Sequence, residues 1–124
     1  MPSAPVQPIS PPPVWKVALP LPLPRLFDYQ PPSGVMAAAS DVGARVRVPF
    51  GTRQLVGVIG TCAEPDGESP ELKTALAPLD PEPLFHGELL ESLRWLARYT
   101  HAPLGEVLAR ALPTPLRAGV PLVD

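Results

Sequence analysis

The chain has 124 residues, of which 45% are hydrophobic and 18% charged, and a formal net charge of −2, a composition that fits one folded domain and excludes a disordered chain. It contains 21 prolines, so long uninterrupted helices and central strands are excluded wherever proline recurs. Its single cysteine excludes an internal disulfide and a thiolate zinc site. We therefore expect a cytoplasmic protein.

The charge is unevenly distributed along the chain. Residues 14–62 contain five basic and two acidic side chains, a local charge of +3, whereas the residues after position 62 contain five basic and ten acidic ones. We therefore expect an anionic ligand to bind the first half. The basic residues form no continuous stripe, so charge alone is not expected to give strong binding to duplex DNA.

The chain begins with a proline-rich stretch. Residues 1–13 hold six prolines and no charged side chain, which predicts a disordered tail. Residues 8–11 match a PxxP pattern, so a partner motif is the alternative to a plain linker.

The sequence predicts neither a signal peptide nor a membrane span. The first residues lack the basic and apolar regions of a signal peptide. The most apolar stretch, residues 17–26, is interrupted by three prolines and therefore cannot cross a membrane.

Four or five short strands are predicted in the first two thirds of the chain. They are rich in β-branched and aromatic residues and are separated by proline and glycine. Short, twisted strands of this kind close naturally into a small barrel. The expected strands cover residues 14–19, 26–29, 44–50, 55–61 and 72–79.

The clearest alternation of polar and apolar residues lies in residues 44–50. Val46 and Val48 are expected inward, and Arg45 and Arg47 on a solvated face where contact with phosphate is the alternative. Three further residues are expected in the core, namely Trp15, Cys62 and Trp95.

After Pro83 the spacing of apolar residues becomes helical. A first helix is expected to end near Tyr99 and a second to begin at Pro103, because proline is favoured in a first turn. Glu91 lies three residues before Arg94 and is expected to pair with it. The two apolar stripes consist of Leu89, Leu90, Leu93, Leu96 and Ala97, and of Leu104, Val107, Leu108, Ala111 and Leu112.

These elements predict an α+β fold. The expected architecture is a small β-barrel-like sheet of four or five short strands followed by two short helices. The domain is expected to cover residues 14–117, with a β part at 14–80 and a helical part at 84–113. Residues 118–124 are expected to start an interdomain linker.

The sequence favours binding over catalysis. It contains no GxxxxGK[ST] loop to hold a nucleoside triphosphate, and no Ser-His-Asp or Cys-His arrangement is evident. The two histidines, His86 and His101, are too far apart for a helical metal pair. We therefore expect no catalytic residue, no metal site and no cofactor within this chain.

The segment Phe27-Asp28-Tyr29 is the candidate binding site. Aromatic rings stack on unpaired bases, and a carboxylate repels phosphate but accepts a hydrogen bond from a hydroxyl, so the combination favours a nucleic-acid end. The alternative, which the residues alone favour, is that Phe27 and Tyr29 are core and Asp28 caps a turn. In a regular strand Asp28 also lies on the face opposite the two rings.

Four motifs, in the same order, resemble the N-terminal DNA-binding domain of the bacterial primosomal replication-restart helicases. The first two are residues 18–29, which end in Phe27-Asp28-Tyr29, and residues 43–51. The third is the short Glu71-Leu72-Lys73, and the fourth covers most of residues 95–113. Together the motifs extend the resemblance over residues 14–117.

The resemblance implies a domain that binds the 3′-hydroxyl end of the nascent leading strand at a stalled replication fork. Asp28 is then the acceptor for the terminal hydroxyl or a base edge, Gly51 permits close approach of the backbone, and Lys73 meets the last phosphate. The pocket carried over by motif consists of Phe27, Asp28, Tyr29, Phe50, Gly51 and Lys73.

The resemblance also carries expectations about the whole protein. The parent is an ATP-dependent 3′-to-5′ DNA helicase whose ATP, Mg and Zn sites belong to domains after residue 124. Its expected partners are single-stranded and forked DNA, single-strand-binding protein and other primosome proteins. The alternative is an SH3-like protein-interaction module that has the scaffold without end recognition.

Overall fold

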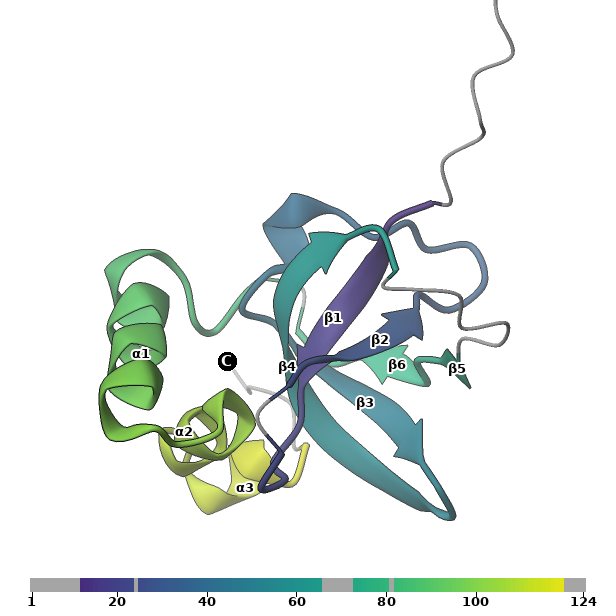
Figure 1. Ribbon diagram of the computed structural model, residues 1–124. Coiled ribbons are helices and arrows are strands. Elements are labelled where there is room, and N and C mark those ends of the chain that lie inside the picture. Colours follow the sequence, from purple (N-terminus) through teal and green to yellow (C-terminus); the bar gives the residue numbers. More distant parts are fainter. Residues whose placement is uncertain (1–11, 24, 66–72, 81, 120–124) are drawn as a thin grey trace, which may run out of the picture.

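A computed structural model describes residues 12–23, 25–65, 73–80 and 82–119. Six strands are followed by three helices, and a short 3-10 helix lies at Ala39–Asp41 (Figure 1). The strands are β1 (Val14–Ala18), β2 (Phe27–Gln30), β3 (Arg45–Phe50), β4 (Arg53–Ala63), β5 (Lys73–Thr74) and β6 (Ala77–Pro78). The helices are α1 (Gly87–Thr100), α2 (Leu104–Arg110) and α3 (Thr114–Arg117).

The strands form one curled sheet in the order β5-β2-β1-β4-β3-β6. All pairs are antiparallel except β2 with β5. The expected α+β fold with a barrel-like sheet is thereby confirmed. The PxxP pattern at residues 8–11, nearly all of the expected tail, and Glu71 and Leu72 of the third motif lie outside the described residues.

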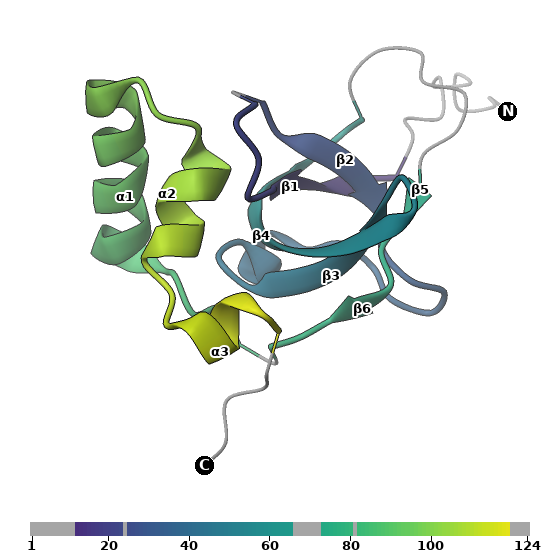
Figure 2. The same ribbon diagram turned by 90° about the horizontal axis from the view of Figure 1, so that it is seen from below.

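The segment after β5 closes the sheet. The sequence predicts one strand at residues 72–79, whereas the structure divides it into β5 and β6 because the segment changes its partner. The Ala75 N–H donates to the Gln30 carbonyl (2.8 Å), next to β5, and the Leu76 N–H donates to the Arg47 carbonyl on β3 (2.8 Å). One short segment thus bonds to both sides of the sheet and curls it into the half-barrel of Figure 2.

The interior of the half-barrel holds the larger apolar cluster. Val46 and Val48 are fully buried there, as predicted. Trp15 is also in the core, and its indole Nε1 donates to the Asp41 carboxylate (2.9 Å). Cys62 is only half-buried, one residue before the end of β4, so its assignment to the core was wrong.

Arg45 corrects the prediction of a solvated strand face. Its side chain is 0% exposed, and its Nε and Nη2 atoms donate to the two carboxylate oxygens of Asp80 (3.0 and 2.7 Å). Its Nη1 donates to the Leu116 carbonyl of α3 (2.7 Å). The prediction was wrong because α3 and the segment after β6 cover this part of the outer face, and Arg47 is likewise only partly exposed.

The helices pack on the outer face of the sheet through a second cluster. Figure 2 shows α2 between α1 and the sheet. The start of α2 touches the end of β1 so closely that a Cβ on Gly105 would lie 1.6 Å from the Leu19 carbonyl oxygen, so only glycine fits there. The buried residues of this cluster are Ala18, Val58, Phe85, Leu90, Leu108 and Leu112.

The outermost helix, α1, buries a narrower stripe than the sequence predicts. Leu90 and Ala97 are buried, but Leu89 and Leu96 are exposed because they lie about 100° or more around the helix from Leu90. Trp95 is 55% exposed, so its assignment to the core was wrong. Within the described ranges, no helix has the length and hydropathy needed to cross a membrane.

Candidate nucleic-acid interface

Two phenylalanines meet at one end of the half-barrel. Phe27 begins β2 and Phe50 ends β3, and their ring centroids lie 5.6 Å apart with the ring planes at 90°. Both side chains are half-buried and pack against the inner cluster. The guanidinium carbon of Arg25 lies 4.4 Å from the centroid of the Phe27 ring, a cation–π contact. This end therefore combines an aromatic pair with a positive charge.

Gly51 follows Phe50 in the turn between β3 and β4. Its φ of +62° lies in the left-handed region, which glycine adopts without strain. Apart from its chain neighbours, no described heavy atom lies within 4 Å of the position that a Cβ would take. A ligand therefore has room to approach the backbone. Phe27, Phe50 and Gly51, three of the six predicted site residues, lie together, and we call them the aromatic rim.

Asp28 lies on the other face of β2. It stands opposite Lys16 in the register of β1 with β2, and the Lys16 Nζ donates to its Oδ1 atom (3.0 Å). The two side chains are only 11% and 14% exposed. The neighbouring Phe27 and Tyr29 face the inner cluster, so the predicted alternation along this strand is confirmed. Asp28 therefore has a structural partner in addition to any ligand.

Tyr29 belongs to the core, as the alternative interpretation holds. It is 3% exposed, and its hydroxyl donates to the Pro49 carbonyl (2.7 Å). Burial raises the pKa of the Tyr29 hydroxyl, because the phenolate would lose its hydration. This hydrogen bond ties β2 to the end of β3, one residue before Phe50. Tyr29 thus helps to hold the aromatic rim in place.

Lys73 is the first residue of β5 and pairs with Tyr29 in the parallel register. Its side chain is exposed. The structure therefore places a lysine beside β2, on the side away from β1. Of the six predicted site residues, three form the aromatic rim, Asp28 lies on the opposite face of β2, Tyr29 is buried, and Lys73 is exposed at the neighbouring strand.

A comparison with protein families identifies the chain. Residues 16–113 match the family described as the 3′DNA-binding domain (3′BD) of PriA. This chain belongs to the PriA 3′DNA-binding domain family. All six predicted site residues fall within the matched range.

Several curated relatives are named replication restart protein PriA. The chain is 45% identical over 107 residues to that of Haemophilus influenzae, covering 86% of this chain and 14% of the relative. It is 31% identical over 105 residues to that of Buchnera aphidicola from Schizaphis graminum, covering 84% and 14%. It is 30% identical over 99 residues to that of Treponema pallidum, covering 76% of this chain and 15% of the relative. The chain therefore spans about a seventh of the length of these PriA relatives.

Two contacts in this PriA-type domain were not predicted from the sequence. Lys16 was not expected beside Asp28, because the pairing depends on the register of β1 with β2, which no local pattern reveals. Arg25 was not expected over the Phe27 ring, although a spacing of two residues in an extended segment is a signal for a shared face. Among the described residues, no group of three His, Cys, Asp or Glu side chains is arranged to hold a metal ion.

Proposed function

We propose that this chain binds the 3′ end of single-stranded DNA, as presented by the nascent leading strand at a stalled replication fork. The observation that carries the proposal is the Phe27–Phe50 pair beside the open Gly51 turn, in a member of the PriA 3′DNA-binding domain family. The terminal nucleotide of a strand has a base without a neighbour on one side. Stacking such a base on an aromatic ring contributes about 1–3 kcal/mol.

Asp28 is the proposed acceptor for the terminal hydroxyl or a base edge. β5 pairs with β2 at Tyr29 and Gln30, and within the described ranges no strand pairs with Phe27 or Asp28 on that side of β2. In the proposed complex the nucleotide contacts the Phe27 ring on one face of β2 and the Asp28 carboxylate on the other. A carboxylate has about four lone-pair sites, so it accepts a hydroxyl in addition to the Lys16 ammonium.

The terminal hydroxyl distinguishes a DNA end from the interior of a strand. A 3′-phosphate in its place would set like charges against each other at Asp28 and remove the donor. Lys73, exposed on β5, is the proposed contact for the last phosphate between nucleotides. Tyr29 acts through the structure, by holding β2 against Pro49.

The activity of the whole protein is also a proposal. From the resemblance and the names of the PriA relatives, we infer that this domain serves an ATP-dependent replication-restart helicase in the cytoplasm. The domain would bring the helicase to a fork by its DNA end, together with single-strand-binding protein and other primosome proteins. ATP, Mg and Zn would be bound by other domains of that protein.

The first prediction tests the aromatic rim. Phe27→Leu keeps an apolar side chain of similar size but removes the ring. The free energy of binding to a short single-stranded oligonucleotide should therefore become weaker by about 1–3 kcal/mol. Fluorescence anisotropy measures the loss. The matched control is Tyr99→Leu, which removes an exposed ring that stacks on Trp95 elsewhere in the molecule, and it should leave the affinity unchanged.

Two outcomes count against the proposal. If only Tyr99→Leu weakens binding, the DNA contact lies on α1 rather than at the rim. If the unmodified chain binds no oligonucleotide at all, the SH3-like interaction module is the better explanation of the fold.

A further inference from the structure

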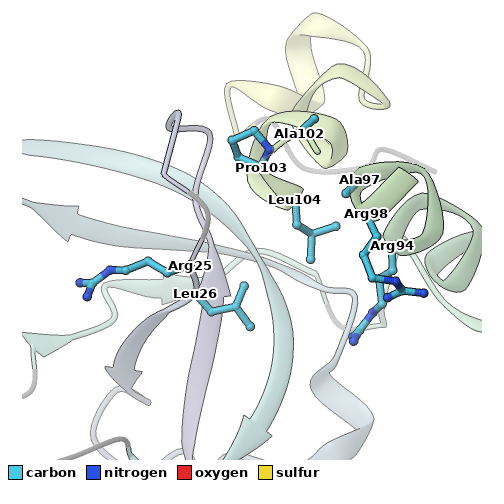
Figure 3. A pocket seen from close by; sticks show the side chains of 8 residues that line it. All are labelled: Arg25, Leu26, Arg94, Ala97, Arg98, Ala102, Pro103 and Leu104. Carbon is cyan, nitrogen blue, oxygen red and sulfur yellow. The ribbon is translucent and has the colours of Figure 1, made fainter. Parts of the chain in front are cut away.

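A second basic site lies between the half-barrel and the helices. A pocket of about 250 Å³ opens where the segment before β2 faces the junction of α1 and α2 (Figure 3). Leu26, Pro103 and Leu104 provide apolar walls. Arg25, Arg94 and Arg98 line the same pocket, and none of the described acidic residues does. The pocket therefore combines apolar surface with the positive charges of Arg94 and Arg98 on α1.

Arg94 is held at the wall of this pocket. Its Nη2 atom donates to the Gly60 carbonyl on β4. Its Nε atom is buried and forms the expected ion pair with Glu91 (3.7 Å), but at that distance no described residue accepts a hydrogen bond from it. A buried N–H without an acceptor is costly, so an anionic acceptor in the pocket would be stabilising.

Arg98 adds a second charge one helical turn further along α1. Its side chain is exposed, and no ion pair is formed by it within the described part of the chain. Figure 3 shows Arg94 and Arg98 extending from the same side of α1. Like charges four residues apart on a helix repel each other. A bound phosphate relieves this repulsion because it attracts both guanidinium groups.

Arg25 connects the pocket to the aromatic rim. It lines the pocket, and its guanidinium, which points away from the helices in Figure 3, lies over the ring of Phe27. A DNA strand that leaves the rim can thus pass over Arg25 and enter the pocket. An acidic peptide offers the same charge, but nothing in the structure connects a peptide to the rim.

We propose that this pocket binds a backbone phosphate of the DNA strand whose 3′ end lies at the aromatic rim. The inference rests on the proposed function and adds the path of the strand, from Phe27 over Arg25 to Arg98 and Arg94. Recognition then has two parts. The rim and Asp28 identify the end, and the pocket fixes the direction in which the strand runs between the half-barrel and the helices.

The test compares Arg98→Ala with the unmodified chain on two ligands, a dinucleotide that reaches only the rim and a longer single strand that also reaches the pocket. Arg98→Ala should weaken the longer strand by about threefold to fivefold, as expected for one exposed ionic contact, and leave the dinucleotide unchanged. The slope of log K against log salt for the longer strand should decrease in magnitude by about 0.7. The control is Arg110→Ala, which removes an exposed arginine outside the pocket.

The outcomes separate this inference from the proposed function. If Arg98→Ala binds the longer strand with the affinity and salt slope of the unmodified chain, the pocket is not on the path of the strand, even where the preference for a 3′-hydroxyl is intact. The inference also fails if Arg98→Ala weakens the binding of an acidic peptide but leaves the binding of the longer DNA strand unchanged. Equal binding of 3′-hydroxyl and 3′-phosphate strands by the unmodified chain would instead overturn the proposed function.

Discussion

Lys16 and Asp28 face each other across β1 and β2, and their contact gives Asp28 two roles that must be separated. The pair is largely buried, so removing the carboxylate leaves an ammonium group in a poorly hydrated place. A loss of DNA binding on mutation of Asp28 is therefore ambiguous by itself. It reports either the loss of an acceptor for the ligand or a disturbed β2.

The prediction at this position uses a double variant. Asp28→Ala should lower both the free energy of unfolding and the free energy of binding to a 3′-hydroxyl end by about 1–3 kcal/mol each, because the Lys16 ammonium and the terminal hydroxyl each lose an acceptor. Lys16→Met combined with Asp28→Ala should regain most of the stability, since the buried ammonium that lost an acceptor is also removed, but not the affinity. Urea unfolding and anisotropy measure the two quantities. Recovery of both would make Asp28 a purely structural residue.

Strand β3 shows how far a local pattern predicts an element. Its alternation correctly predicted that Val46 and Val48 are buried, because a period of two is a property of the strand itself. It wrongly predicted a solvated Arg45, whose partners Asp80 and Leu116 lie 35 and 71 residues further along the chain. The sequence does not reveal which distant element will cover the outer face of a strand.

The buried pair of Arg45 and Asp80 makes β3 dependent on the segment after β6. Arg45→Ala should lower the free energy of unfolding by about 3–5 kcal/mol, because Asp80 is left as a buried charge without its partner. The matched control, Arg53→Ala, removes an exposed arginine at the start of β4 and should change stability by no more than about 0.5 kcal/mol. Both are measured by urea unfolding. Similar small losses for the two variants would contradict the buried pair.

At the scale of the whole molecule, the order of strands followed by helices was predictable, because the spacing of apolar residues changes after Pro83. The closure of the sheet was not, since it depends on residues 73–78 bonding to both β2 and β3. The site divides in the same way. Phe27 and Phe50 were identified through motifs, but their contact arises from the curl of the sheet.

The central claim is that the chain recognises the 3′ end of a DNA strand. The most direct measurement is the anisotropy of two single-stranded oligonucleotides of identical sequence, one ending in a 3′-hydroxyl and one in a 3′-phosphate. Because the phosphate removes the donor for Asp28 and adds negative charge there, the 3′-hydroxyl strand should bind at least about tenfold more tightly, a difference of about 1.4 kcal/mol. Equal affinity for the two strands would contradict recognition of the end.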